Sequence, residues 1–298
     1  MKLEGVIYCG DNLYWMSRLP DEVVDLCYID PPFFSNRNHK VIFGDGEEIR
    51  SFEDRWKGGI EDYIDWMRDR VQEIHRMLKP TGSLYLHCDW HASHYLKVMC
   101  DEVFGYSNFV SEVVWYYTSG GGRGRRWFNR KHDTILVYGK TRDYFYDGLA
   151  LKDTRTKDEG SFGGYFKTDK NGRRYQEVRA GGKTYKYYID QPKNPDDVWM
   201  VPNIPQRDLT ERMGYPTQKP EALLERIIEA SSNPRDLVFD CFCGCGTTLV
   251  AAQKLARRWL GIDVSPTGCK LVQHRLSELG VRAEIVDLPR TIQAPENT

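Results

Sequence analysis

The stretch LVFDCFCGCGTT (residues 237–248) decides the fold, because an apolar run meets a Gly-rich turn that opens a helix. A short apolar run bounded by turn residues is typical of a buried parallel strand. The sequence then predicts a second strand over 257–263 and a further helix over 266–279. The two strands end in Asp240 and Asp263. Because ligands gather at the carboxyl ends of parallel strands, we expect a binding site there.

The N-terminal part of the chain repeats this alternation of strands and helices. The pattern predicts strands over 5–9, 23–29, 83–88, 110–117 and 133–139, and helices over 12–18, 60–77 and 91–104. Neither part of the chain completes a sheet alone. We therefore expect one Rossmann-like, doubly wound α/β sheet that is split in sequence between residues 1–140 and 215–290.

Residues 141–214 differ in character, because Gly, Lys, Arg and Tyr interleave there. The segments 164–176 and 179–190 resemble hairpins, since Asn-Gly and Gly-Gly lie between β-prone runs. We expect an inserted, β-rich lobe over 141–214 and a frayed tail over 291–298.

Composition and charge limit the classes of protein to which the chain can belong. No apolar run reaches the roughly 20 residues of a membrane helix, and eight cysteines without a CxxC pair predict reduced thiols in a cytoplasm. The net charge is −1, but residues 120–190 hold 17 Lys and Arg against 9 Asp and Glu, whereas the rest holds 25 against 34. The basic segment can therefore face a nucleic acid.

The tetrapeptide Asp30-Pro31-Pro32-Phe33 follows the apolar run 23–29 and carries groups that can hold a nucleobase. The Asp30 carboxylate and the Pro31 carbonyl can accept the two hydrogens of an exocyclic amine, which frees the nitrogen lone pair for attack on a methyl donor. Phe33 can stack on the base, which must first leave the duplex. The alternative is a Pro-Pro turn with a capping aspartate.

The Gly-rich turn predicts a cofactor site. Gly244 and Gly246 allow close approach of a ligand, and Asp240 can accept from an amino group. The turn lacks the GxGxxG pattern, and its helix opens with Thr247, so we favour a cofactor without phosphates. Asp263 can accept both hydroxyls of a ribose; capping of the following helix is the alternative.

The cysteine and histidine clusters do not predict a metal site. Cys241, Cys243 and Cys245 alternate within a tight turn and have no fourth ligand nearby, so we expect small packing residues. The other group is interpreted as surface or packing residues: His87, His91 and His94. Asp133, with His132, can lie near the target base, although an ordinary hydrogen-bonding role is the simpler interpretation.

Taken together, these motifs resemble the β-type DNA amino-methyltransferases, whose catalytic half precedes the target-recognition region and whose cofactor half follows. The resemblance spans Tyr8 to Leu276 and rests on eight segments in the family's order: YCGDN (8–12), YIDPPF (28–33), LKPTGSLYLH (78–87), HDTILVY (132–138), DDVW (196–199), YPTQKPEALLERII (215–228), FDCFCGCGTT (239–248) and RRWLGIDVS (257–265). Two departures are Phe33, where the family usually has Tyr, and Cys241, where Pro is common.

The resemblance implies roles for individual residues. It places the flipped base on Asp30, Pro31, Pro32 and Phe33. It places S-adenosylmethionine on Asp11, Thr217, Lys219, Asp240, Phe242, Gly244, Gly246, Thr247 and Asp263, with the adenine near Asp11 and the methionine end near Thr217 and Lys219. A helix beginning at Pro220 could receive the cofactor's carboxylate at its N-terminus. Asp in the first position of DPPF is similar to the adenine-N6 members.

The resemblance also implies double-stranded DNA as the partner, in a bacterial, archaeal or phage-encoded system, with a homodimer and a cognate restriction endonuclease as further partners. The expected DNA contacts are Arg123, Arg125, Arg126, Arg173, Arg174, Arg179, Lys183 and Lys186. Residues 33–56 are expected to form a long polar loop beside the active site, either a lid or a plain surface loop.

Alternative functions stay open at this point. They are a cytosine-N4 DNA methyltransferase, a protein-glutamine or RNA methyltransferase, and a DNA-binding subunit without catalysis. The basic lobe between the two halves favours DNA over protein as the substrate, and the intact DPPF and Gly-rich turn favour an enzyme.

Overall fold

The computed structural model describes residues 1–35, 37–43, 47–54, 56–117, 126–153, 166–205, 207–208, 211–215 and 217–289. The tail 291–298, which we expect to be frayed, lies outside the described residues. The chain folds into two compact units. The first joins Met1–Phe145 with the segment from Asp197 onward, and the second is Tyr146–Asp196, which falls inside the expected insertion.

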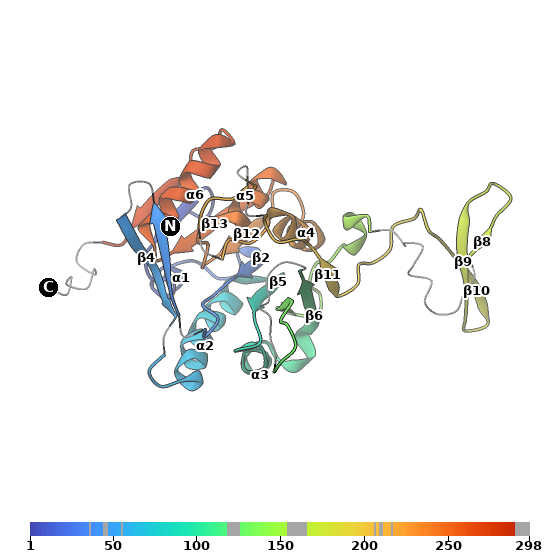
Figure 1. The fold of residues 1–298 in the computed structure, drawn as a ribbon, viewed down its shortest axis with the longest axis horizontal. Coiled ribbons are helices and arrows are strands. Elements are labelled where there is room, and N and C mark those ends of the chain that lie inside the picture. The colour runs from blue at the N-terminus through green and yellow to red at the C-terminus, as the bar shows by residue number, and fades with distance from the viewer. Residues whose placement is uncertain are drawn as a thin grey trace. The chain divides into compact units, whose positions relative to one another are not determined.

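The first unit is built on a mixed sheet of nine strands within the described residues (Figure 1). In spatial order these are β11 (Val198–Met200), β6 (Phe109–Tyr116), β7 (His132–Gly139), β5 (Leu78–Cys88), β2 (Val24–Ile29), β12 (Leu237–Asp240), β13 (Arg258–Asp263), β1 (Val6–Cys9) and β14 (Glu284–Asp287). The strands from β5 to β14 are parallel, and β7 is antiparallel to both of its neighbours.

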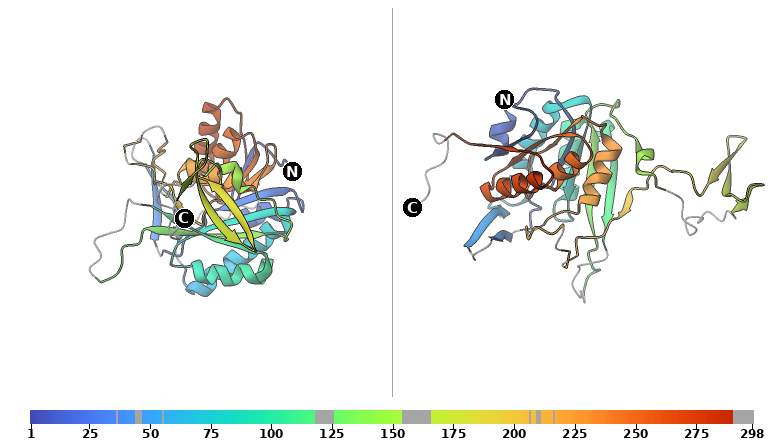
Figure 2. Two further views of the ribbon diagram at one scale, coloured as in Figure 1. Left: turned by 90° about the vertical axis from the view of Figure 1, so that its right-hand side faces the viewer. Right: turned by 90° about the horizontal axis from the view of Figure 1, so that it is seen from above.

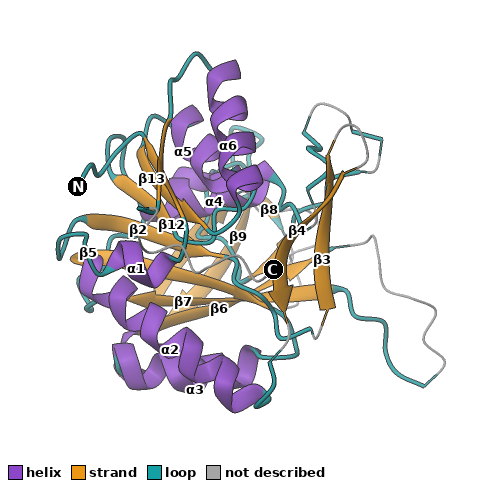
Figure 3. Cartoon of the chain, turned by 90° about the vertical axis from the view of Figure 1, so that its left-hand side faces the viewer, coloured by secondary structure: helices purple, strands orange, loops and turns teal. Residues whose placement is uncertain are grey.

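Helices cover both faces of this sheet (Figures 2 and 3). One face carries α1 (Asn12–Met16), α2 (Ile60–Met77) and α3 (Ser93–Phe104), and the other carries α4 (Glu221–Ser231), α5 (Thr247–Lys254) and α6 (Pro266–Glu278). Short 3-10 turns lie at Tyr106–Asn108 and Gly148–Leu151. The prediction of one doubly wound α/β sheet is confirmed. None of the described helices combines the length and the apolar character that a membrane crossing requires.

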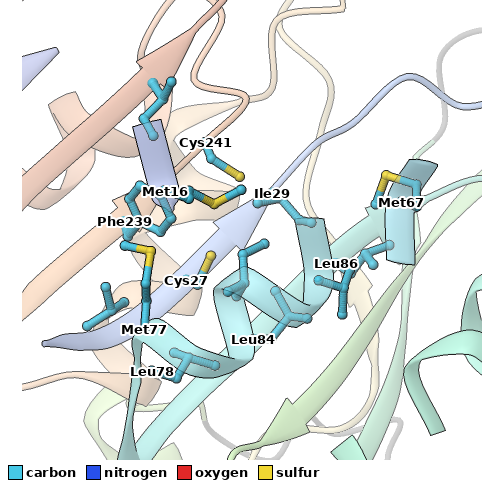
Figure 4. Close-up of a cluster of buried hydrophobic side chains, with 14 of the residues drawn as sticks. Met16, Cys27, Ile29, Met67, Met77, Leu78, Leu84, Leu86, Phe239 and Cys241 are labelled. Atoms are coloured by element: carbon cyan, nitrogen blue, oxygen red, sulfur yellow. The ribbon is translucent and has the colours of Figure 1, made fainter. Parts of the chain in front are cut away.

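The core joins segments that are far apart in sequence. Cys27 of β2 pairs in register with Phe239 of β12, and both side chains are fully buried. Met16 and Met77 pack in the same cluster (Figure 4). Because β2 and β12 are buried on both faces, both read as nearly continuous apolar runs in the sequence.

The structure corrects the expected polar loop over 33–56. Residues there form a separate two-stranded antiparallel sheet, β3 (Arg37–Phe43) and β4 (Glu47–Asp54), shown in Figure 3. The sequence holds a reason for the hairpin, because the β-prone run VIF (41–43) precedes an Asp-Gly dipeptide. The polar composition had concealed this pattern.

The second unit holds a three-stranded antiparallel sheet of β8 (Lys167–Thr168), β9 (Arg174–Ala180) and β10 (Lys183–Tyr188). Ala180 pairs with Lys183, so Gly181 and Gly182 form a two-residue hairpin loop. Both glycines have positive φ, 57° and 76°, which the favoured hairpin turn requires. The predicted hairpins are therefore confirmed.

Candidate active site

A cavity of about 820 Å³ opens at the carboxyl ends of the central parallel strands. The residues that follow β5, β2, β12, β13 and β1 all line it, as expected for a ligand site in an α/β sheet. It brings together Asp30, Pro31, Pro32, Phe33, Asp11, Thr217, Lys219, Asp240, Phe242, Gly244, Thr247 and Asp263. Gly246 does not line the cavity; a side chain there would meet Val272 at 2.7 Å, so it serves close helix packing.

Asp30 follows β2 directly and presents its two carboxylate oxygens differently. Oδ2 accepts a hydrogen bond from Lys219 Nζ at 2.6 Å, and the two side chains are only 17% and 9% exposed. Oδ1 is buried, and no described residue donates a hydrogen bond to it. A buried acceptor without a donor costs free energy, so Oδ1 is suited to a hydrogen bond from a ligand.

Phe33 stacks on a buried histidine that the sequence reasoning had left among packing or surface residues. The rings of Phe33 and His87 lie 5.6 Å apart at 26°. His87 Nδ1 is 2.8 Å from the Tyr28 hydroxyl, and its Nε2 is 3.2 Å from Asp133 Oδ2. Tyr117 donates to the other oxygen of Asp133 at 3.1 Å. The chain of side chains Tyr28, His87, Asp133 and Tyr117 fixes the surface behind Phe33.

The charge state of Asp133 follows from this arrangement. Burial opposes its ionisation, but the hydrogen bonds from His87 and Tyr117 and the charge of Lys219 together outweigh burial and lower the pKa of the carboxyl. Asp133 therefore stays an anion and orients the imidazole ring beneath Phe33. The hydrogen-bonding role considered for Asp133 is thus the one seen.

The Gly-rich turn carries a buried carboxylate at the end of β12. Asp240 accepts from the Phe242 amide at 2.9 Å and from the Thr248 hydroxyl at 2.6 Å. Burial raises the pKa of Asp240 to about 7 in spite of these two hydrogen bonds. Gly244 follows at φ +51°, a left-handed conformation that favours glycine.

Asp240→Asn is expected to change how stability depends on pH. Asp240 keeps its proton up to about pH 7 in the folded chain, whereas the ordinary pKa of an aspartate is 3.8. Between these pH values the carboxyl ionises in the unfolded chain only, so the free energy of unfolding falls as the pH rises. The variant should match the wild type near pH 4 and exceed it at pH 8 by up to a few kcal/mol, since one pKa unit is worth about 1.4 kcal/mol. Chemical denaturation at pH 4, 6 and 8 measures the difference, and a constant difference would contradict it.

Asp263 ties the turn to the next helix. Its Oδ2 accepts from the Gly244 amide at 2.7 Å and its Oδ1 from the Ser265 amide at 2.8 Å. Burial raises the pKa of this carboxyl. Asp263 thus makes backbone contacts of the capping kind, and it also faces the cavity, where its remaining lone pairs can accept from a ligand.

Aromatic and cationic side chains of α2 complete the cavity wall near Asp11. Asp11 caps α1 by accepting from the Tyr14 amide, and it pairs with Arg70 at 2.9 Å. The Arg70 guanidinium lies 3.7 Å over the ring of Trp66, which in turn lies 5.8 Å from the ring of Phe242. The sequence did not predict Arg70 and Trp66 as site residues, because both fit the helical periodicity of an ordinary buried helix face.

The N-terminus of α4 differs in detail from the expectation. Pro220 is the cap residue, and the first helical amide, that of Glu221, donates to the carboxylate of Glu211 at 2.6 Å. Thr217 adopts a left-handed φ of +62°, which bends the chain so that Lys219 reaches Asp30. The contact of a cofactor carboxylate with this helix stays a prediction.

The expected DNA contacts divide into three groups. Arg123 and Arg125 lie outside the described residues. Arg126 is exposed in the first unit. In the second unit, Arg173 is paired with Asp190 at 2.8 Å, Arg174 lies over the ring of Phe166, and Lys186 lies over that of Tyr175. The remaining two, Arg179 and Lys183, are exposed beside the Gly-Gly loop.

A doubly wound sheet with a Gly-rich turn on one central strand and DPPF on its neighbour defines a Rossmann-like methyltransferase. Residues 24–274 match the model of the N6/N4 DNA methylase family, and the chain belongs to this family.

Similar proteins include two bacterial relatives. The chain is 30% identical to DNA adenine methyltransferase YhdJ of Escherichia coli (strain K12), over 90% of this chain and 81% of that protein. It is 27% identical to Type II methyltransferase M.HpaI of Haemophilus parainfluenzae, over 91% of this chain and 73% of that protein.

Solved structures share the fold. A putative DNA modification methylase from Thermus thermophilus, complexed with S-adenosyl-L-methionine, has a TM-score of 0.58 at 20% identity and covers 95% of this chain and 98% of its own. The cytosine-N4-specific PvuII DNA methyltransferase has a TM-score of 0.61 at 18% identity, with coverages of 96% and 98%.

Proposed function

We propose that the chain transfers the methyl group of S-adenosylmethionine to N6 of adenine in duplex DNA after base flipping. One observation carries the proposal: Asp30, whose buried Oδ1 receives no hydrogen bond from any described residue, lines the same cavity as the Gly-rich turn. An acceptor for an amine and a site for a methyl donor are thus adjacent, because β2 and β12 are neighbours in the sheet.

The side chains that line the cavity suit S-adenosylmethionine. The side chains of Asp240 and Asp263 flank the turn and offer oxygen acceptors, to which an ammonium and ribose hydroxyls can donate. The rings of Trp66 and Phe242, with Asp11 nearby, can hold a purine. The likeness to a structure that holds this cofactor agrees with this fit.

The chain's own residues would prepare the adenine amine for attack. The amine donates one hydrogen to Asp30 Oδ1 and the other to the Pro31 carbonyl, which turns the nitrogen lone pair out of ring conjugation. Phe33, backed by His87, supplies the stacking surface for the base. S-adenosylmethionine would supply a sulfonium methyl: as the N–CH3 bond forms, the S–CH3 bond breaks and leaves a neutral thioether, and the nitrogen releases one of its two protons to solvent. Relatives named as adenine methyltransferases favour adenine over cytosine.

Duplex DNA is the proposed partner, with exposed cations of the first unit and the 179–183 hairpin as contacts. Arg126, Arg179 and Lys183 are the strongest of the expected set, whereas Arg173 is already paired with Asp190. A second copy of the chain, a cognate restriction endonuclease and a cytoplasmic location stay predictions.

Sequencing of modified bases tests the proposal. DNA from a host that expresses the wild-type chain should carry N6-methyladenine at one short motif, and DNA from a host that expresses Asp30→Ala should not. Mass spectrometry of the hydrolysed DNA identifies the base independently. N4-methylcytosine would assign the cytosine alternative, and the absence of any methylated base would contradict DNA methylation.

A further inference from the structure

The rim of the cavity carries a stack of aromatic and cationic side chains. The Arg130 guanidinium lies 3.7 Å over the ring of Trp90, and Trp90 stacks on His91 with ring centroids 3.7 Å apart at 30°. All three residues line the cavity, and Trp90 is still 47% exposed. His91 is held by the carboxylate of Asp89. The stack therefore has a fixed base and an open outer surface.

Two further large aromatic residues closely precede Arg130 in the sequence. Trp127 is 63% exposed and Phe128 is 98% exposed, three and two residues before Arg130. Since a chain spans at most about 3.5 Å per residue, their Cα atoms lie within roughly 11 Å of that of Arg130. Two adjacent aromatic side chains this exposed are not part of the core, and Arg126 and Arg130 flank them. Aromatic rings between arginines are typical of surfaces that bind nucleic acids.

We propose that Trp127 and Phe128 insert into the base stack of the DNA next to the flipped nucleotide, while Arg126 and Arg130 neutralise adjacent phosphates. The inference rests on the proposed function. If a base enters this cavity, the duplex must lie against its rim, which Arg130 lines, and the Cα atoms of Trp127 and Phe128 lie within roughly 11 Å of that of Arg130. Flipping unstacks a nucleotide and leaves a gap, and apolar side chains inserted between base steps offset that loss.

The positive charge of the segment favours DNA over a second copy of the chain as the occupant. The stretch RRWFNRK (125–131) has four cations and no carboxylate, whereas the chain as a whole has a net charge of −1. A like-charged pair of such segments would repel across a symmetric dimer interface, but a phosphate backbone attracts them.

Single-turnover methylation by Trp127→Ala, Phe128→Ala and the double variant tests the proposal, on the motif found by sequencing. Each single variant should lose roughly tenfold in rate on matched duplex and the double variant roughly a hundredfold, which is the scale of lost base stacking. On a duplex mismatched at the target position, where flipping costs less, most of the loss should be recovered. Fluorescence of 2-aminopurine at the target should fall in parallel, and S-adenosylmethionine affinity should be unchanged.

Tyr106→Ala is the matched control, because Tyr106 is 78% exposed and does not line the cavity. It should retain wild-type rates on both duplexes. The inference is overturned if the double variant methylates matched duplex at the wild-type rate. It is equally overturned if the rate of the double variant falls by the same factor on matched and mismatched DNA. It is also overturned if the variants lose self-association in sedimentation without a flipping defect, which would assign the aromatic pair to a second copy. A wild type that methylates no DNA would instead refute the proposed function.

Discussion

Asp30→Ala is expected to lower the rate of methyl transfer by about 10³-fold, the scale on which one preorganised transition-state partner contributes. The variant removes Oδ1, the buried acceptor that no described residue satisfies. S-adenosylmethionine should still bind within about threefold of the wild-type affinity, because its proposed contacts are with Asp240 and Asp263 beside the Gly-rich turn and not with Asp30. Single-turnover methylation and calorimetric titration of the cofactor measure the two quantities.

Asp25→Ala is the control for this experiment. Asp25 lies on β2, the strand that Asp30 follows, accepts from Lys79 at 2.6 Å as Asp30 does from Lys219, and does not line the cavity. Its loss should reduce stability and leave the rate of the folded protein within a few fold. Wild-type activity of Asp30→Ala, or an equal loss in both variants, would exclude Asp30 as the amine acceptor.

Lys219→Met is expected to lower the rate by about 10²-fold while cofactor affinity changes little. The ammonium holds Asp30 Oδ2 at 2.6 Å and so fixes where Oδ1 points. Without it the carboxylate can rotate, and a displacement of about 1 Å in a reacting group costs on this order. The resemblance to the family suggested instead that Lys219 serves the methionine end of the cofactor. In that case affinity for S-adenosylmethionine would fall at least tenfold, and the rate at saturating cofactor would not.

A double-mutant cycle sharpens this distinction. If Lys219 acts through Asp30, the Asp30→Ala, Lys219→Met double variant should be no slower than Asp30→Ala alone. Independent roles would instead make the two losses multiply. Lys79→Met, which breaks the matched pair with Asp25, controls for the general cost of removing a half-buried ammonium.

The strand-ending acids were predictable, because a local pattern marks them. Asp30, Asp240 and Asp263 each follow a short apolar run, and parallel strands bring such residues to one edge of the sheet. The turn glycine Gly244 was predictable for the same reason. The basic hairpin of the second unit was predictable from its Gly-Gly loop, because two-residue hairpin turns need positive φ values that glycine adopts without strain.

Contacts that depend on register or on a backbone bend were not predictable. His87 reaches Phe33 only because Ile29 pairs with Leu86 across β2 and β5, and a polar residue in a buried run gives no sign of its partner. Lys219 lies 189 residues from Asp30 in sequence and meets it through the left-handed turn at Thr217. The hairpin over 37–54 was missed because charged residues masked its alternation.

The central position of β12 has a consequence for synthesis in the cell. β2 ends at Ile29, and β12, one of its two neighbours in the sheet, begins at Leu237. The ribosome must therefore add about 200 residues before β2 and β12 can pair. At roughly 5–20 residues per second this takes on the order of 10–40 s. During that interval one edge of an apolar strand lacks its partner on the nascent chain. Translation speed and chaperone supply should therefore govern the yield of active enzyme, and a circular permutant that begins near residue 215 would shorten this wait.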